Sequence, residues 1–445
     1  MLHGPLLRKI VAFALPLALT SIMQQLFNSA DASAAGQFIG SNALAAIGAT
    51  TPLVNLVVSL FVGLSVGANV IVAQQIALED DQGIHDAVHT SMVLAVVSGV
   101  AIVVVGVLLA RPLLELISTP AEVIDLATVY LQIYFVGTAF TTFYNFGSAI
   151  LRSKGDTKRP LYVLIIACVL NIALNALFVL VFHWDVAGIA WATTISNGLA
   201  AVMVTIMLMH EEGSMQFKWR ELSAKRRPLS IALKIGIPAG VQGVVFAISN
   251  VVIQVALNWL GSEAMAGSIA AQNYEIYTYF IVNAFAQAAV TFTSQNYAVG
   301  NPARCNRICR ECLLLGVGGS FTVSMIFVLG GQFFLGLFTS DAAAIGYGMI
   351  RLLHAEAFAL LPTVYEVPAG SMRGMGWSTL PAIITVLGTC VLRIAWVYTI
   401  FASSGTMETL MNVYPISWGV TGAVMVVAYF IVRKRAYSEL TKQAA

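Results

Sequence analysis

A single ionisable residue, Asp31, stands between Lys9 and Glu79. So long a stretch without charge cannot form the surface of a protein in water, but it suits helices that each cross a bilayer with about 20 apolar residues. Similar stretches recur along the whole chain, in which 58% of the residues are hydrophobic and 10% are charged. Soluble domains carry about 25% charged residues. The chain is therefore expected to be an integral membrane protein. Its formal net charge of +2 argues against a nucleic-acid partner.

Twelve apolar segments are long enough to span a membrane as helices. They cover residues 10–37, 44–78, 88–110, 122–150, 160–182, 186–209, 229–258, 264–299, 308–335, 342–371, 380–402 and 414–432. The expected fold class is an all-α integral membrane protein with twelve transmembrane helices.

Basic residues gather in the loops on one side of these segments. If the N-terminus is cytoplasmic, the inner loops receive the basic clusters at 152–159, 218–227 and 433–435, and the outer loops receive Arg111 and Arg351. Cytoplasmic loops of membrane proteins carry an excess of Lys and Arg. We therefore expect a multi-pass protein of the cell (inner) membrane with both termini in the cytoplasm.

An internal repeat relates the two halves of the chain. Residues 152–160 read RSKGDTKRP and residues 373–381 read RGMGWSTLP, with Arg, Gly and Pro at the same spacing. The same offset places Gln74 on Gln295. Because each half holds an even number of spans, both halves enter the membrane from the same side.

The repeat predicts three parts. Residues 1–210 form an N-terminal six-helix bundle, residues 211–228 a basic cytoplasmic linker, and residues 229–445 a C-terminal six-helix bundle. The two bundles are expected to be related by a pseudo-two-fold axis along the membrane normal, an arrangement that suits alternating access.

An ordered set of motifs resembles the multidrug and toxic compound extrusion (MATE) family of cation-coupled antiporters, in its bacterial form. The first half contributes FNSADASAAGQFIGSNALAAIGA, GLSVGANVIVAQQ, LRSKGDTKRP, LNIALNALFVL and VAGIAWATTIS, and the second half contributes QNYA and SMRGMGWSTLP. The resemblance implies two six-helix bundles in a V around a central cavity. It also implies export of organic, cationic or amphipathic compounds, driven by inward Na⁺ or H⁺ movement.

Other expectations concern partners and cofactors. A small organic substrate and membrane lipid are the expected partners, the chain is expected to act as a monomer, and no cofactor is expected apart from Na⁺ or H⁺ as the coupling ion. The alternative function is a lipid or lipid-linked oligosaccharide flippase of the same superfamily.

Asp31 is the first candidate for the coupling residue. A charge in the middle of the membrane costs about 2.5–3.5 kcal/mol on the most lenient scale, so such residues usually face a cavity and act in transport. Gln24 and Asn28 share a helical face with Asp31 and are candidate cavity residues. The plainer interpretation is that Asp31 lies near the outer end of its helix and is solvated.

The resemblance extends the candidate cation site to the fifth and sixth spans. In the family branch concerned, the site consists of the first-helix Asp, an Asn, an acid four residues later, and a Thr on the next helix. Asp31, Asn171 and Thr193 match this pattern, whereas Asn175 stands in place of the second acid. Asn171 and Asn175 could instead serve only as interhelical hydrogen-bond partners.

The second half holds three further candidates for a substrate or cavity site. Glu366 and Arg393 lie in apolar spans, where an acid and a base are mutually stabilising as a structural ion pair. An anionic-substrate site and a second coupling site remain open for them. Glu275 lies among tyrosines in NYEIYTYF and could belong to an aromatic wall for cations, or to an ordinary interfacial belt.

Two prolines occupy matching places in the halves, Pro16 in the first span and Pro238 in the seventh. Proline removes a backbone hydrogen bond and kinks a helix. The two prolines are candidate hinges, or else static kinks.

No enzymatic or metal site is expected. Cys305, Cys309 and Cys312 have a spacing seen in iron–sulfur sites, but they share one helical face at the beginning of a span. The histidines suggest no metal site, and no ATP-binding phosphate loop is present. An intramembrane enzyme would need a nucleophile paired with a base within the spans, and the sequence offers none.

Overall fold

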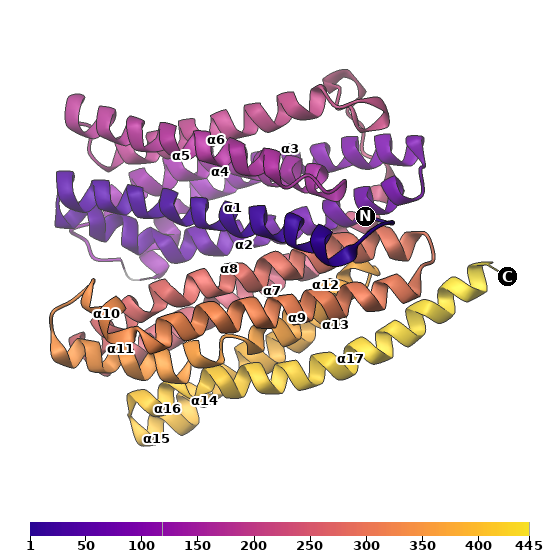
Figure 1. Cartoon of the computed structure of the whole chain (residues 1–445). Helices are drawn as coiled ribbons and strands as arrows, with labels where there is room; N and C mark the ends of the chain where they lie inside the picture. The colour runs from indigo at the N-terminus through magenta and orange to yellow at the C-terminus, as the bar shows by residue number, and fades with distance from the viewer. Residues whose placement is uncertain (118, 445) are drawn as a thin grey trace. The chain divides into compact units, whose positions relative to one another are not determined.

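The computed structural model describes residues 1–117 and 119–444, and these form helices and connecting segments without a β-strand (Figure 1). The elements of the first half are α1 (Leu6–Ala34), η1 (Ala35–Ile39), α2 (Ser41–Ala77), α3 (Asp81–Leu116), α4 (Ile124–Ser153), α5 (Lys158–Ala176), η2 (Leu177–Val181), α6 (Val186–Met209), η3 (Gly213–Met215) and η4 (Trp219–Glu221). Here η1 and η2 are π-helical, and η3 and η4 are 3₁₀-helical.

The second half repeats this series of long helices with more interruptions. Its elements are α7 (Arg226–Asn258), α8 (Ser262–Ala298), α9 (Pro302–Leu329), α10 (Gly331–Gly336), α11 (Ala342–His354), η5 (Glu356–Phe358), α12 (Leu361–Gly374), α13 (Thr379–Thr385), η6 (Val386–Val391), α14 (Leu392–Trp396), η7 (Val397–Phe401), α15 (Ala402–Ser404), α16 (Met407–Met411) and α17 (Val413–Ala444).

The predicted fold class is confirmed. Within the described chain, ten helices are long and apolar enough to cross a membrane, and a further span consists of α11 with η5 and then α12, which meet at 40°. The helix α8 is as long as α2 but less apolar. Each of the twelve predicted spans overlaps one of these helices.

The lower hydropathy of α8 has a structural cause. One side of α8 contacts α9, α11 and α12, and its buried side includes small and polar residues such as Gly267, Ser268, Thr278 and Gln295. Small residues let helix backbones approach closely in a membrane: a Cβ added to Gly267 would lie 1.9 Å from the carbonyl oxygen of Ala344. An interior helix needs fewer large apolar side chains than one that faces lipid.

Contacts divide the described chain into two compact units, residues 19–240 and residues 1–18 together with 241–445. The helices α1 and α7 therefore each pass from one unit into the other. The sequence predicts a different division, into two duplicated halves joined by the linker at residues 211–228. That division describes the repeat in the sequence and stays a prediction. The chain passes from one unit to the other two residues after Pro16, and it passes back two residues after Pro238.

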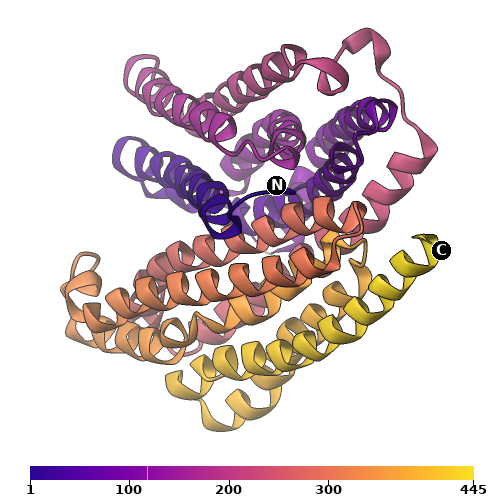
Figure 2. The same cartoon turned by 45° about the vertical axis from the view of Figure 1, so that its right-hand side comes forward.

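Equivalent helices pack alike within each unit. In the unit of residues 19–240, α4 packs against α2, α3 and α6. In the other unit, α12 packs against α8, α9 and α17, and α8 and α9 run side by side in both views (Figures 1 and 2). The repeat seen in the sequence therefore reappears in the helix contacts.

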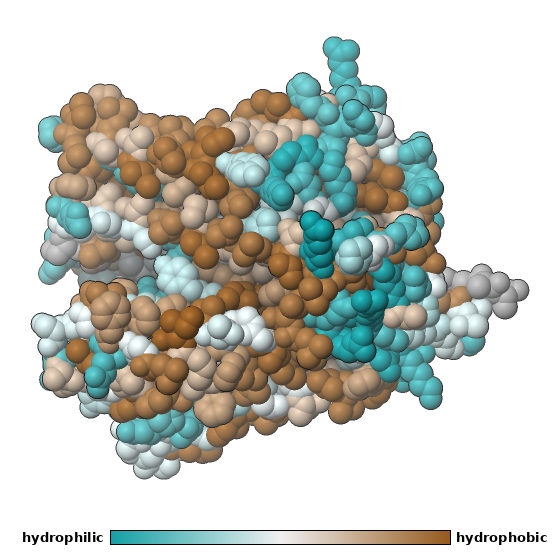
Figure 3. Space-filling model, viewed as in Figure 1, coloured by the Kyte–Doolittle hydropathy of each residue, from teal (hydrophilic) through white to brown (hydrophobic). Residues whose placement is uncertain are grey.

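Hydropathy varies along the helices as expected for a membrane protein. The middle of α8 and α9 is mostly hydrophobic on the face shown in Figure 3, and hydrophilic residues gather at the end where α9 begins. Large apolar side chains such as Leu314, Phe321 and Leu329 of α9 are exposed. This exposure is favourable only where lipid is the solvent.

Candidate functional site

Asp31 is buried in the last turns of α1, with 3% of its surface exposed. Its carboxylate accepts hydrogen bonds from three side chains. The Nδ2 of Asn171 lies 3.1 Å and the Nδ2 of Asn175 lies 2.8 Å from Oδ1, and the Thr193 hydroxyl donates to Oδ2. The structure thus brings together the four residues that the sequence proposed as a cation site, and it places Asp31 away from solvent.

The partners of Asp31 are also bonded to one another. Asn171 donates to the Thr193 hydroxyl at 3.2 Å, and Asn175 donates to the Asn171 Oδ1 at 3.2 Å. The two asparagines are one turn apart on α5, and Thr193 lies on α6, so helices distant in sequence converge on one carboxylate. Such a network fixes the amide orientations, because a reversed amide would direct its oxygen at the carboxylate.

The cluster holds one formal charge. The three residues that donate to Asp31 are neutral, and the Oδ1 of Asn175 is buried with no hydrogen-bond partner among the described residues. Buried charges are ordinarily paired with an opposite charge. The arrangement can therefore hold one added positive charge, which would neutralise the carboxylate.

Two π-helical turns adjoin this cluster. The turn η1 begins four residues after Asp31, and η2 begins two residues after Asn175. Single π turns are often found at functional sites, since they widen the helix and displace its side chains. Tyr130 of α4 is buried nearby and packs with Ala35 and Val179 of these turns.

The predicted cavity residues of the first half lie outside the cluster. Gln24 and Asn28 are exposed, whereas Asp31, further along the same helix, is buried. The spacing of the three side chains puts them on one helical face, but of the three only Asp31 is hydrogen-bonded to α5 and α6.

In the second half, Glu275 forms a bidentate ion pair with Arg351. The Nε and Nη2 of Arg351 lie 2.6 and 2.8 Å from the two carboxylate oxygens. Arg351 also donates to the Ser268 hydroxyl at 2.6 Å, and its guanidinium lies 5.4 Å from the ring centre of Tyr414. The negative charge of Glu275 is therefore already compensated by a protein cation.

Glu356 is a second buried acid beside this pair, with 1% of its surface exposed. The Thr278 hydroxyl donates to its Oε1, and its Oε2 has no hydrogen-bond partner among the described residues. Glu356 is therefore less compensated than Glu275.

The ion pair expected between Glu366 and Arg393 does not form. Glu366 instead pairs with Arg373, two turns further along α12, at 3.8 Å, and Arg373 donates to the Gln242 Oε1 at 2.7 Å. Two turns of one helix bring side chains onto the same face, which makes this local pair available without bridging to α14.

Arg393 is enclosed by aromatic rings. Its guanidinium lies 4.5 Å from the ring centre of Tyr414, 5.4 Å from that of Phe246 and 5.8 Å from that of Trp418. It donates to Ser417 and Asn250, at 3.3 Å in each case. Aromatic faces attract cations, more strongly where water is excluded, so the rings take the place of a carboxylate.

One group that sequence reasoning missed lies at the linker. The ligand atoms of His85, His89 and Glu221 all lie within 4.8 Å of one another, close enough for a metal ion. The spacing of the two histidines by four residues was the available signal. Both ring nitrogens of His89 are engaged, however: Nδ1 lies 2.8 Å from the His85 carbonyl oxygen, and the backbone N–H of Lys218 donates to Nε2 at 3.2 Å.

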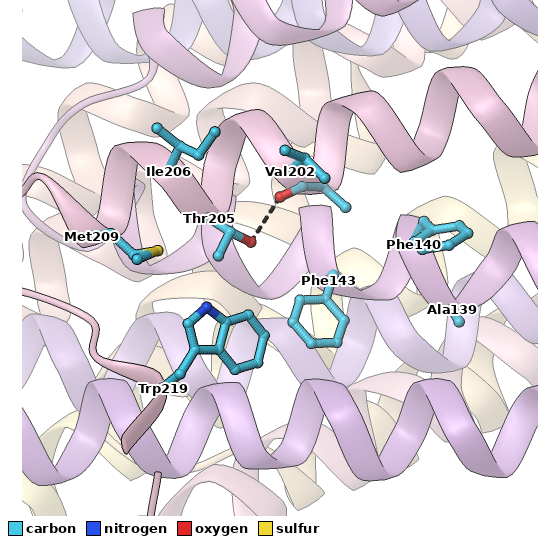
Figure 4. Close-up of a pocket in the computed structure, with 9 residues that line it drawn as sticks. Ala139, Phe140, Phe143, Val202, Thr205, Ile206, Met209 and Trp219 are labelled. Carbon is cyan, nitrogen blue, oxygen red and sulfur yellow. Dashed lines mark hydrogen bonds between the residues drawn. The ribbon is translucent and has the colours of Figure 1, made fainter. Parts of the chain in front are cut away.

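An apolar pocket of about 390 Å³ lies between α4 and α6 (Figure 4). The linker residue Trp219 closes one part of it, opposite Phe143, with the two rings stacked at 6.3 Å. The pocket is lined by Ala139, Phe140, Phe143, Ala201, Val202, Thr205, Ile206, Met209 and Trp219. It is separate from the Asp31 cluster and carries no ionisable group among these residues.

Comparisons with known proteins agree with the repeat and with the fold. The MatE family profile matches the chain twice, over residues 16–177 and 238–399, and the two matches begin at the duplicated prolines. The probable multidrug resistance protein YpnP of Bacillus subtilis (strain 168) is 29% identical over 396 residues, covering 88% of this chain and 87% of its own. YoeA of the same organism, also a probable multidrug resistance protein, is 26% identical, covering 85% and 83%.

A solved structure has the same fold. The outward-facing conformation of a multidrug resistance MATE family transporter of the MOP superfamily superposes with a TM-score of 0.90 at 23% identity, over 99% of this chain and 98% of that one. The family profile covers most of both halves, and the relatives are matched over most of their length. This chain therefore belongs to the MatE family and is a membrane transporter, not an enzyme.

Proposed function

We propose that this transporter exports organic, cationic or amphipathic compounds in exchange for one monovalent cation that binds at Asp31. The observation that carries the proposal is the buried Asp31 carboxylate, whose three hydrogen-bond donors are all neutral. One uncompensated negative charge suits one proton or one Na⁺, and a divalent ion would want more carboxylates.

The hydrogen bonds favour a proton over Na⁺. Both amides direct their NH₂ groups at the carboxylate, so Na⁺ would require Asn171 and Asn175 to reverse before their oxygens could become ligands. A proton on Oδ2 requires only that the Thr193 hydroxyl turn from donor to acceptor. The smaller rearrangement supports H⁺ as the coupling ion.

Exchange follows if the affinity for substrate depends on whether the Asp31 carboxylate carries a proton. A proton that neutralises the carboxylate removes the charge that favours a cationic substrate, and the buried network of α1, α5 and α6 changes with it. The relatives named as multidrug resistance proteins support an organic substrate, and the aromatic lining of the pocket between α4 and α6 is suited to apolar rings.

Orientation is part of the proposal. With the basic linker and both termini in the cytoplasm of the cell, as the distribution of Lys and Arg predicts, the chain moves its substrate outward. Labelling cysteines introduced at residues 155 and 220 with an impermeant reagent tests this: reaction in intact cells would contradict the orientation.

The deciding experiment uses purified protein in liposomes with the organic cation ethidium as the substrate. Three gradients are imposed separately: a pH gradient, a Na⁺ gradient, and a membrane potential without either. The proposal expects the pH gradient to drive ethidium movement. Ethidium movement driven by a Na⁺ gradient alone would show that Na⁺, and not the proton, is the coupling ion. Movement of phospholipid instead of ethidium would favour the flippase.

A further inference from the structure

A pocket of about 530 Å³ opens on the unit that contains residues 241–445, where the first turns of α9 face residues 426–433 of α17. It lies outside the Asp31 cluster and is lined by Ala303, Asn306, Arg307, Cys309, Arg310, Leu313, Pro368, Val426, Tyr429, Phe430 and Arg433.

Three arginines line this pocket, and they carry more positive charge than the adjacent acid can balance. Arg307 is paired with Glu311, whose Oε1 lies 2.6 Å from Nε. Arg433 donates to the Asn306 Oδ1 at 3.3 Å and lies 4.7 Å from the ring centre of Phe430. Arg310 is exposed. Neither Arg310 nor Arg433 forms an ion pair with a carboxylate in the described part of the chain.

The rest of the lining is apolar. Leu313, Pro368, Val426 and Phe430 form the side of the pocket that continues along the spans α9 and α17. The arginines lie toward the ends of these spans, where hydrophilic residues gather on the surface (Figure 3). A phospholipid has its charged phosphate at the membrane surface and its acyl chains within the membrane. A pocket with positive charge at one end and an apolar wall at the other therefore suits an anionic phospholipid.

We propose that this pocket is a specific site for an anionic phospholipid. The headgroup phosphate lies between Arg310 and Arg433, and one acyl chain lies against Leu313, Val426 and Phe430. A free phosphate would use the arginines but would leave the apolar wall in contact with water, so the lipid is the better fit to the whole pocket. The bound lipid would add to the contact between α9 and α17 that Arg433 and Asn306 already make.

The test compares two double variants with equal changes of charge. R310Q/R433Q removes the two arginines without a carboxylate partner and leaves the pair of Arg307 with Glu311. The matched control, K434Q/R435Q, removes two exposed basic residues of the same helix end that do not line the pocket. A third variant, R310K/R433K, keeps the charge, and thermal unfolding in phosphatidylcholine checks that each variant is folded.

The measurement is the phosphatidylglycerol retained by protein purified from bilayers of phosphatidylcholine and phosphatidylglycerol, determined by native mass spectrometry. A basic side chain near an anionic membrane surface contributes about a fivefold factor in binding, so R310Q/R433Q should bind roughly 25-fold more weakly. K434Q/R435Q and R310K/R433K should retain the lipid. Equal loss from both Gln variants, or no preference for phosphatidylglycerol in the wild type, would overturn the proposal.

A cysteine introduced as A303C provides an independent readout, since Ala303 lines the pocket and is exposed, whereas the native Cys309 is buried. Bound phosphatidylglycerol should slow the reaction of the introduced cysteine with a maleimide, with the modified cysteine identified by peptide mass spectrometry, and water-soluble glycerol phosphate should not. Equal protection by glycerol phosphate would show a site for free anions and would refute the lipid.

Discussion

Replacing Asp31 with asparagine removes the charge of the buried cluster but keeps its shape. The asparagine oxygen can take the place of Oδ1 and accept from Asn171 and Asn175, while its NH₂ takes the place of Oδ2 and donates to Thr193. The variant therefore imitates an acid that is permanently protonated. We expect it to fold, to bind a cationic substrate more weakly, and to lose export driven by a pH gradient.

The effect on stability follows from the same contacts. A hydrogen bond to a charged group contributes about 1.5–3 kcal/mol and one between neutral groups about 0.5–1.5 kcal/mol, so three bonds that lose their charge weaken by roughly 3 kcal/mol in total. Against this, the variant no longer buries a charge, which itself costs several kcal/mol. The two effects nearly cancel, and the free energy of unfolding should change by no more than about 2 kcal/mol.

Ethidium movement in liposomes with an imposed pH gradient measures the loss of coupling. The rate for D31N should fall to that of protein-free liposomes, whereas ethidium exchange without a gradient should persist at ethidium concentrations high enough to offset the weaker binding. The control is D125N, which makes the same chemical change at an exposed acid of α4 that pairs with Arg111 at 2.9 Å; it should transport normally. Transport by D31N at the wild-type rate would refute the assignment, and Glu356 would be the next buried acid to test.

Four further outcomes follow from the structure. N175D should raise the number of protons exchanged per ethidium from one toward two, measured from pH changes during transport, because Asp31 would face a second carboxyl at about the 2.8 Å that now separates it from the Asn175 amide; an unchanged ratio would contradict this. R351M should lower the free energy of unfolding by about 3–5 kcal/mol, since it leaves Glu275 buried without its cation, and adding E275Q should restore most of the loss in thermal unfolding. P238A should slow ethidium transport without weakening ethidium binding if the proline is a hinge, and an unchanged rate would make it a static kink. Hydrogen bonds from His85 and Lys218 lower the pKa of Glu221, so this acid stabilises the linker fully above its ordinary pKa of 4.5 and loses that effect as the pH falls through the lowered value. The protection of linker amides from hydrogen exchange, relative to the intrinsic rate at each pH, should therefore fall in acid for the wild type and already be reduced at neutral pH for E221Q.

The long helices were predictable because the membrane restricts the alternatives. An apolar stretch has few folds available in lipid other than a spanning helix, and a polar side chain within it must find a polar partner from another helix. The grouping of Asp31 with Asn171, Asn175 and Thr193 came from the resemblance to the MATE family, because the first and sixth spans hold several other polar residues. Their roles in coupling stay a prediction.

The pairing of charges in the second half could not be read from sequence in the same way. Arg351 and Glu275 are brought together by contact of α8 with α11, and periodicity says nothing of which helices touch. Arg393 looked like a partner for Glu366 because both are costly to bury alone, but a nearer cation, Arg373, was available on the same helix. Aromatic rings around Arg393 were an alternative means of stabilisation that a search for opposite charges overlooks.

The contacts also divide the chain at places that the duplicated halves do not indicate. Repeats mark where the sequence was copied, whereas compact units depend on packing. The first turns of α1 pack with the second half, where Phe13 meets Phe292 edge-on at 5.5 Å. The duplicated prolines near both crossings were visible in the sequence, but their position at the crossings required the structure.

Proton release on substrate binding tests the central claim most directly. Ethidium is added to purified, detergent-solubilised transporter in a weakly buffered solution without Na⁺, and the released protons are measured with a pH indicator. If a proton on Asp31 exchanges with the substrate, the wild type at a pH at which Asp31 is protonated should release up to one proton for each ethidium bound. D31N should bind ethidium more weakly and release none. Equal release by the two proteins, or ethidium binding by the wild type without proton release, would contradict coupling of a proton at Asp31.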